Sequence, residues 1–196
     1  MRVVSLFSGA GGLDFGFIKA GHQILWANDL YRDAVETYQK NIGNHIVCED
    51  ISKISTSDIP DCDIVIGGFP CQGLSVAYSK RHVDDESNVL YKQLLRVIRY
   101  KNPKFFLAEN VKGILSIGKG KVFQMILDDF QSIGYNVQYR VLNAADYGVP
   151  QTRLRVIIAG VRKDVHFEYK YPSPTNSKDG ANGLPRWVSV SDALKD

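Results

Sequence analysis

Short apolar runs and amphipathic segments alternate along most of the chain. Runs without strict polar alternation are typical of strands buried on both faces, and they occur at residues 3–7, 24–27, 46–47, 64–66, 105–108 and 156–159. Apolar side chains recur at helical spacing at residues 13–20, 31–38, 89–98 and 122–130, the second with Tyr31, Ala34, Val35 and Tyr38 on one face. Residues 135–142 alternate like a further strand. This order predicts the α/β class, with a mostly parallel sheet and helices on both faces.

Glycine and polar residues gather where these strands are expected to end. They are Gly9 to Gly12, Asp29, Asp50, Cys71 and Glu109. In open parallel sheets, ligands bind beyond the carboxyl ends of the strands. We therefore expect one edge of the sheet to carry the functional site.

The glycine-rich turn after the first strand indicates a nucleoside-binding site. Asp29 follows it by about twenty residues, a spacing that suits a carboxylate accepting both ribose hydroxyls. Asp14 stands where a dinucleotide fingerprint needs its last glycine, which disfavours a Rossmann oxidoreductase. Such a turn is often only structural, but Asp50 at a neighbouring strand end favours a nucleoside cofactor such as S-adenosylmethionine.

Cys71 lies in a turn-forming stretch, residues 67–75, after the fourth predicted strand. Most lone intracellular cysteines are buried packing residues. Here two glycines and Pro70 present the thiol past the strand end, among polar neighbours. A free thiol is only ~a few per cent thiolate at neutral pH, so a nucleophilic Cys71 needs a site that favours the anion.

Three further charged residues are candidates for the same site. Glu109 ends an apolar strand, either as a cap or surface charge or as a carboxyl group that exchanges a proton in a partly dry cleft. Arg153 and Arg155 alternate into the last strand and therefore share a face. They could orient a base, bind phosphate or serve only solubility.

The composition limits the classes of protein to which the chain can belong. The 196 residues suffice for one domain with a sizeable core, and the net charge of +3 permits nucleic-acid binding without demonstrating it. The three cysteines lack paired metal-ligand spacing, so we expect no metal. No apolar run approaches the ~20 residues that span a bilayer, and the N-terminus lacks signal-peptide features. We expect a cytoplasmic protein that does not contact membranes.

Several motifs, in this order, resemble those of the DNA (cytosine-5)-methyltransferases. They occupy residues 7–12, 28–29, 50–51, 68–72, 109–111 and 151–155. The resemblance runs from Val3 to about Gly160, and it implies a Rossmann-like, S-adenosylmethionine-dependent methyltransferase fold. It also implies a catalytic and cofactor-binding domain at residues 1–162, followed by a polar tail at residues 163–196 that leads toward a target-recognition domain.

The resemblance also assigns roles to individual residues. Cys71 would attack carbon 6 of a cytosine flipped out of double-stranded DNA, and Glu109 would contact the ring nitrogen 3 and the exocyclic amine. Carbon 5 would take the methyl group of S-adenosylmethionine, and loss of its proton would release Cys71. Arg155 would hold the base and Glu109, with Arg153 in support. The cofactor pocket would comprise Phe7, Gly9, Gly11, Asp29, Leu30, Asp50, Ile51, Phe69 and Leu90, with Phe7 on the adenine, Asp29 on the ribose and Asp50 on the adenine amine.

Two parts of the family pattern do not occur in these 196 residues: the target-recognition domain and a later segment that returns to the cofactor site. We therefore expect a shortened protein, a natural fragment or one subunit of a split enzyme, with weak or no sequence-specific methylation by this chain alone. A second chain carrying the target-recognition domain is one expected partner, and a restriction-modification system is the expected setting. The alternatives are a transfer RNA cytosine-5 methyltransferase and a non-catalytic cofactor-binding or DNA-binding subunit.

Overall fold

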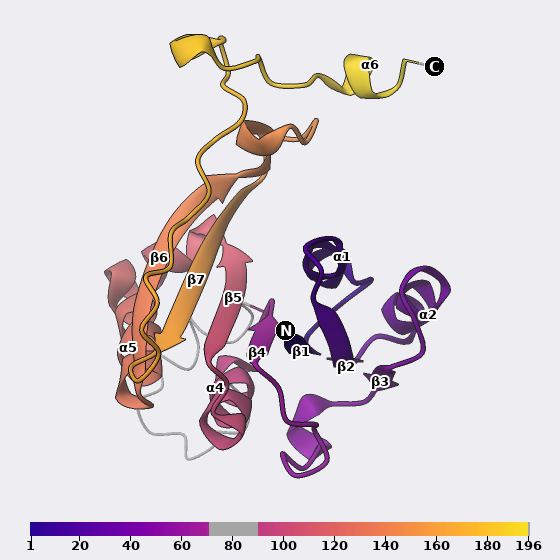
Figure 1. The fold of residues 1–196 in the computed structure, drawn as a ribbon, viewed down its shortest axis with the longest axis vertical. Coiled ribbons are helices and arrows are strands. Elements are labelled where there is room, and N and C mark those ends of the chain that lie inside the picture. The colour runs from indigo at the N-terminus through magenta and orange to yellow at the C-terminus, as the bar shows by residue number, and fades with distance from the viewer. Residues whose placement is uncertain (71–89, 196) are drawn as a thin grey trace.

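A twisted seven-stranded sheet forms the centre of the protein (Figure 1). The computed structural model describes residues 1–70 and 90–195. Along the sheet, the strand order is β3-β2-β1-β4-β5-β7-β6. The strand bounds are β1 Arg2–Leu6, β2 Gln23–Asp29, β3 Ile46–Cys48, β4 Ile64–Gly67, β5 Phe105–Val111, β6 Tyr135–Asn143 and β7 Leu154–Arg162. The first five strands in this order run parallel, while β7 pairs antiparallel with both β5 and β6.

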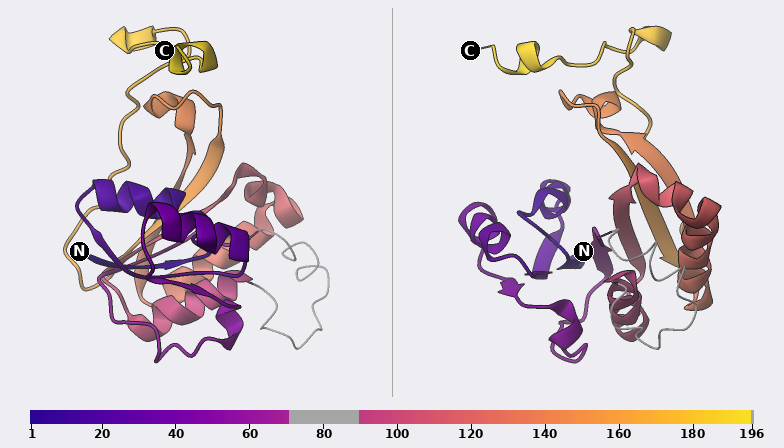
Figure 2. Two further views of the ribbon diagram at one scale, coloured as in Figure 1. Left: turned by 90° about the vertical axis from the view of Figure 1, so that its right-hand side faces the viewer. Right: turned by 180° about the vertical axis from the view of Figure 1, so that it is seen from behind.

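Helices cover both faces of the sheet, as Figure 2 shows from two further directions. The helices and 3₁₀ turns are α1 Gly12–Lys19, α2 Arg32–Asn41, η1 Ile51–Lys53, α4 Leu90–Lys101, η3 Lys112–Gly120, α5 Lys121–Ser132, η4 Ala144–Tyr147, η5 Ala181–Gly183 and α6 Val190–Ala193. Buried side chains of α4 and α5 pack in one core, and those of α2 pack in another. The predicted mostly parallel sheet with helices on both faces is confirmed.

Alternation along the central strands explains the two cores. Val3 of β1 and Ile64 of β4 belong to the core beside α2, whereas Val4 and Val65 belong to the core beside α4 and α5. Successive side chains of a strand point to opposite faces, so a continuous apolar run supplies both cores. This pattern is why these strands lack polar alternation in the sequence.

The ends of the strands bring the predicted site residues to one edge of the sheet. The chain leaves β1, β2, β3, β4 and β5 at this edge because these strands are parallel. The antiparallel β7 begins at the same edge, where Arg155 lies opposite Val111. The sheet therefore places the start of β7 beside the end of β5.

Tyr31 departs from the prediction. It was expected on the buried face of α2, yet it is 70% exposed, while Val35 and Tyr38 are buried. Tyr31 is the residue before the helix, with extended backbone angles, so the helical periodicity does not apply to it.

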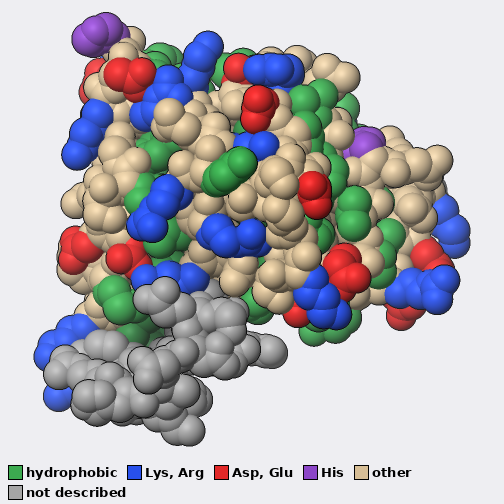
Figure 3. All heavy atoms as spheres, turned by 90° about the horizontal axis from the view of Figure 1, so that it is seen from below, with side chains coloured by type: hydrophobic (Ala, Val, Ile, Leu, Met, Phe, Trp, Pro, Cys, Tyr) green, Lys and Arg blue, Asp and Glu red, His purple; other side chains and the backbone are tan. Residues whose placement is uncertain are grey.

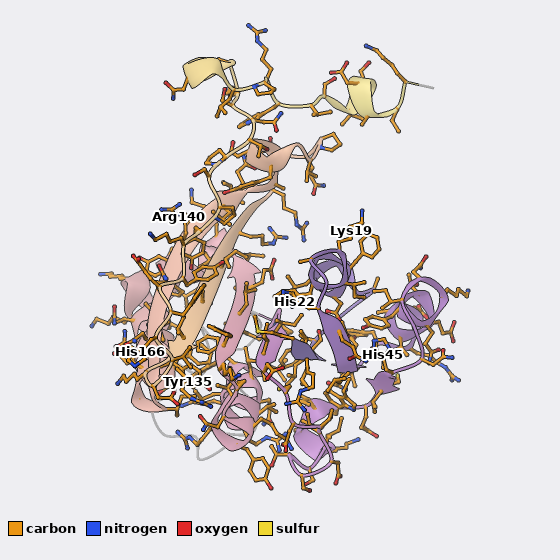
Figure 4. All side chains as sticks on the ribbon, in the orientation of Figure 1. Lys19, His22, His45, Tyr135, Arg140 and His166 are labelled. Atoms are coloured by element: carbon orange, nitrogen blue, oxygen red, sulfur yellow. The ribbon has the colours of Figure 1, made fainter. Side chains whose placement is uncertain are left out.

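The polar tail first runs back along the sheet and then extends away from it (Figures 1 and 2). The Tyr171 hydroxyl lies 2.9 Å from the carbonyl oxygen of Ile157 in β7, and Gln138 Nε2 of β6 donates to the carbonyl oxygen of Tyr169 at 2.7 Å. Arg140 of β6, labelled in Figure 4, lies over the Tyr171 ring. The division of the chain at residue 162 stays a prediction.

Candidate active site

A pocket of about 410 Å³ lies at the strand-end edge of the sheet. It joins the turn after β1, the start of α1, the end of β4, β5 and the approach to β7. Its lining comprises Ser5, Leu6, Phe7, Ser8, Gly12, Leu13, Asp14, Gly68, Glu109 and Arg153. The volume falls within the range of ~300–1,000 Å³ that is usual for small-molecule sites. The predicted cofactor residue Phe7 and the predicted catalytic residues Glu109 and Arg153 therefore share one pocket.

Glu109 forms an ion pair with Arg155 across the β5–β7 boundary. Arg155 Nε lies 2.7 Å from Glu109 Oε1, and the exposed fractions of the two side chains are 23% and 28%. Arg155 Nη1 also donates to the carbonyl oxygen of Leu154 at 2.9 Å. A charge-assisted bond of this length, partly shielded from water, fixes the orientation of the carboxylate. Arg153 precedes β7 and lines the pocket beside this pair.

Gly68 leaves room for the Glu109 carboxylate. A Cβ atom at position 68 would lie 3.2 Å from Glu109 Oε2, which is tighter than most Cβ contacts. The absence of a side chain therefore lets the backbone after β4 approach the carboxylate closely. Gly68 begins the segment that leads to Cys71, and Cys71 itself lies outside the described residues.

Asn110 ties the end of β5 to the same segment. Its Nδ2 donates to the carbonyl oxygen of Phe69 at 2.7 Å, and its Oδ1 accepts from the backbone N–H of Val111 at 2.8 Å. Both Asn110 and Phe69 are buried, so the bond between them is shielded from water. Asn110 lies in the motif at residues 109–111, but the sequence does not predict its role because its partner is 41 residues away in the chain.

The turn after β1 is bound to the end of β2. Phe7 has a φ angle of 54°, in the left-handed region that non-glycine residues rarely adopt. The backbone N–H of Gly9 donates to Asp29 Oδ2 at 2.7 Å, and the N–H of Tyr31 donates to Asp29 Oδ1 at 2.9 Å. Strained residues of this kind cluster at functional sites, where the surrounding structure holds them.

The Asp29 carboxylate retains hydrogen-bond acceptor sites that the hydroxyl groups of a nucleoside could use. Each carboxylate oxygen offers about two acceptor sites, and the backbone occupies one on each oxygen. The other sites can accept hydroxyl donors. The residues present therefore fit a ribose-containing ligand.

Asp50 and Ile51 lie at the neighbouring strand end. Asp50 caps η1 through a bond of 2.9 Å from the Ser52 N–H to its Oδ1, and this bond lowers the pKa of Asp50 below its ordinary value. Ile51 is buried. Asn28 Nδ2 donates to the carbonyl oxygen of Glu49 at 2.8 Å and thereby links this turn to β2.

A buried polar network supports the glycine turn from inside the protein, and no local pattern in the sequence indicates it. Asp14 accepts from Ser5 Oγ at 2.7 Å and from the Tyr38 hydroxyl at 2.8 Å, and Tyr38 lies 3.0 Å from His45 Nε2. His45 lies just before β3 (Figure 4). Because the Tyr38 hydroxyl gives its only proton to Asp14, His45 acts as the donor to Tyr38. Burial raises the pKa of Asp14 above its ordinary value, and the two hydrogen bonds offset this only partly.

The remaining predicted cofactor residues are dispersed around this edge. Phe69 is buried and packs against Tyr91 at a ring-centroid distance of 6.2 Å, Leu90 is half-buried, and Leu30 is 57% exposed. The lining of the 410 Å³ pocket includes Phe7 but does not include Asp29, Leu30, Asp50, Ile51, Phe69 or Leu90. Of the predicted catalytic residues that the structure describes, Glu109 and Arg155 are in direct contact.

Two features are absent from residues 1–70 and 90–195, the part of the chain that the structure describes. In this part of the chain, no group of three His, Cys, Asp or Glu side chains is placed to hold a metal ion. None of its helices is both long enough and apolar enough to cross a bilayer.

Comparison with known proteins identifies the family. The sequence profile of the C-5 cytosine-specific DNA methylases matches residues 1–194, and the chain belongs to this family. It is 48% identical over 195 residues to the type II methyltransferase M.NgoFVII of Neisseria gonorrhoeae, covering 98% of this chain and 52% of that protein. It is 40% identical to the type II methyltransferase M.BsuRI of Bacillus subtilis, covering 100% of this chain and 51% of that protein. The chain thus spans about half the length of these curated relatives.

Solved structures agree on the fold. A crystal structure of an E. coli prophage protein, assigned as a DNA modification methyltransferase, superposes with a TM-score of 0.76 at 30% identity and covers 99% of this chain and 54% of that protein. The Dnmt2 methyltransferase of S. pombe superposes with a TM-score of 0.67 at 23% identity, covering 87% of this chain and 51% of that one, which shows a shared fold alone. The predicted Rossmann-like methyltransferase fold is confirmed.

Proposed function

We propose that this chain is the catalytic core of a DNA (cytosine-5)-methyltransferase, which transfers a methyl group from S-adenosylmethionine to carbon 5 of a flipped cytosine. The observation that carries the proposal is the Glu109–Arg155 ion pair. It lies where a pocket shared with Phe7 meets the segment that leads to Cys71. A carboxylate held by a guanidinium can recognise the polar edge of a base, because each group fixes the orientation of the other.

The cofactor would lie along the ends of β1, β2 and β3. Phe7 would contact the adenine, Asp29 would accept from the ribose hydroxyls, and Asp50 would accept from the adenine amine. Gly9, Gly11, Leu30, Ile51, Phe69 and Leu90 would complete the pocket. When bound, S-adenosylmethionine would supply an electrophilic methyl group.

The protein's own groups would prepare cytosine for that transfer. The Cys71 thiolate would form a bond to carbon 6, and the electron pair of the 5,6 double bond would become available at carbon 5. Glu109 would contact ring nitrogen 3 and the amine and stabilise the charge that develops on the ring. Arg155, supported by Arg153, would hold Glu109 and the base. Once carbon 5 had formed its bond to the methyl group, loss of the carbon-5 proton to water would re-form the double bond and release Cys71 as a thiolate.

The proposed setting follows from the relatives. Because two curated relatives with 40–48% identity are named type II methyltransferases, we place the chain in a restriction-modification system of a prokaryotic cytoplasm. Double-stranded DNA is the proposed substrate. A second polypeptide that supplies a target-recognition domain is a proposed partner, and it would correspond to the half of the curated relatives that this chain does not match.

A methyl-transfer assay tests this proposal. The chain is incubated with radiolabelled S-adenosylmethionine and either cytosine-containing duplex DNA or transfer RNA. The chain is tested with each nucleic acid both by itself and together with a polypeptide that supplies the second half of a curated relative. We expect label at carbon 5 of cytosine in DNA, and its loss in Glu109→Gln. Labelling of transfer RNA in place of DNA would contradict the proposed substrate.

A further inference from the structure

We propose that Arg96 is a positioning residue for the adenine end of the cofactor site. From α4 its guanidinium holds the η1 turn that carries Asp50 and Ile51. This inference rests on the proposed function, because it takes Asp50 as the group that recognises the adenine amine. Arg96 lies outside the motifs that resemble those of the DNA (cytosine-5)-methyltransferases, and it does not line the pocket that contains Glu109.

The η1 turn has little regular structure of its own. It comprises three residues and follows β3, a three-residue strand at the edge of the sheet. Its local bonds run from the Lys53 N–H to the Asp50 carbonyl at 2.9 Å and from the Ile54 N–H to the Ile51 carbonyl at 3.3 Å. So short a turn needs long-range contacts to keep a fixed position.

Arg96 supplies such contacts on the side of the turn that follows Asp50. Its Nη2 donates to the carbonyl oxygens of Ile51 at 2.8 Å and Ile54 at 3.1 Å, and its Nη1 donates to that of Ile54 at 3.1 Å. Its Nε donates to Gln93 Oε1 at 2.9 Å, which orients the guanidinium from its own helix. The partners in Ile51 and Ile54 are 45 and 42 residues away in the chain.

The opposite side of the turn is held by Asn28, which donates to the Glu49 carbonyl. Asp50 and Ile51 are therefore held on both sides: Asn28 binds the carbonyl of the residue before them, and Arg96 binds the carbonyls of Ile51 and Ile54. Figures 1 and 2 show this turn, in purple, beside the N-terminal half of the sheet and close to α4. The hydrogen bonds of Arg96 thus connect the proposed adenine end of the site to α4.

The chemistry of these contacts favours positioning over charge neutralisation. The four Arg96 bonds described above all go to neutral oxygens, three times to backbone carbonyls and once to an amide. A planar guanidinium can reach two carbonyls and an amide at fixed angles, whereas the ammonium of lysine is a single point of donation. Partial burial lowers the pKa of Arg96 from its ordinary value, and a guanidinium stays protonated in proteins, so Arg96 is charged.

Arg99 provides a matched control on the same helix. It lies three residues further along α4 and is exposed. Seen from below, the described part of the surface carries lysine and arginine side chains dispersed among acidic and uncharged ones (Figure 3). Removal of the positive charge of the exposed Arg99 should leave the η1 turn in place.

The test measures discrimination at the adenine amine. Binding of S-adenosylhomocysteine and of S-inosylhomocysteine, in which a carbonyl oxygen replaces the amine, is measured by calorimetry for wild type, Arg96→Gln, Arg96→Lys and Arg99→Gln. We expect wild type and Arg99→Gln to prefer the adenosyl ligand about tenfold, the effect of one well-placed hydrogen bond. Arg96→Gln should bind the adenosyl ligand about tenfold more weakly, with a preference near unity, and Arg96→Lys should fall between them.

Each outcome is decisive. The preference is a ratio of two affinities from one preparation, so a smaller folded fraction does not change it. If Arg96→Gln does not fold, a reduced preference in Arg96→Lys supports the proposal. A wild-type preference in a folded Arg96 variant overturns it. A wild-type chain that binds neither ligand contradicts the proposed cofactor, and one that binds both equally contradicts the role of Asp50; either result also overturns the role of Arg96.

Discussion

Removal of the Glu109–Arg155 ion pair should lower the free energy of unfolding by more than the removal of an exposed surface pair does. The charged atoms are 2.7 Å apart, and about three quarters of each side chain is shielded from water. Exposed pairs contribute roughly 0.2–1 kcal/mol, while breaking a fully buried pair costs roughly 3–5 kcal/mol. The intermediate burial places the expected coupling free energy at about 1.5 kcal/mol.

A double-mutant cycle measures this coupling. Urea unfolding gives the free energy of unfolding for wild type, Glu109→Gln, Arg155→Gln and the double variant. The Arg32–Glu36 pair is the matched control, because it joins the same atom types at 3.5 Å with exposed fractions of 85% and 56%. Its coupling should be about 0.3–0.5 kcal/mol and should fall further in salt. A Glu109–Arg155 coupling no larger than that of the control would refute the reasoning.

Three further predictions concern the surroundings of this pair. Gly68→Ala should displace the Glu109 carboxylate by a few tenths of an ångström, with little loss of stability. This displacement should slow the formation of a covalent protein–DNA adduct on 5-fluorocytosine about tenfold. An unchanged rate of adduct formation would count against the close contact. Asn110→Ala should lower the free energy of unfolding in urea by about 2 kcal/mol, because the buried Phe69 carbonyl loses its donor; a loss below about 0.5 kcal/mol would show that this bond is unimportant. Burial raises the pKa of Asp14 above 3.8, so its contribution to stability is present below pH 3.8 and is lost as the pH rises through the folded-state pKa. The side chain of Asp14→Asn does not titrate. The free energy of unfolding of Asp14→Asn minus that of wild type should therefore rise between pH 3.8 and the folded-state pKa of Asp14. A difference that stays constant or falls would contradict a raised pKa for Asp14.

Much of the fold follows from local patterns in the sequence. Continuous apolar runs such as residues 64–66 predicted buried strands, because a strand between two helical layers needs apolar side chains on both faces. A continuous apolar run can be recognised without any periodicity, whereas the ends of helices depend on capping. Tyr31 shows the limit, since an extended residue before α2 does not share the face of the helix.

The site was predictable only where a residue's type and position at a strand end indicate its chemistry. Glu109 and Arg155 met this condition, and the antiparallel β7 brings them into contact. Asn110 and Arg96 act through backbone carbonyls that are more than forty residues away, and no local pattern encodes such partners. The Asp14 network likewise joins α1 to Ser5 of β1 and Tyr38 of α2, and through Tyr38 to His45, so it depends on how these elements pack together.

Covalent trapping on 5-fluorocytosine DNA tests the central claim most directly. The chain, alone and with a polypeptide that supplies the second half of a curated relative, is mixed with S-adenosylmethionine and a duplex that contains 5-fluorocytosine. Fluorine cannot leave as a proton does, so the bond between Cys71 and carbon 6 should persist through denaturation and appear as a protein–DNA adduct. We predict this adduct for wild type and its loss in Cys71→Ala. An adduct that survives Cys71→Ala, or none with wild type under either condition, would contradict cytosine-5 methylation through Cys71.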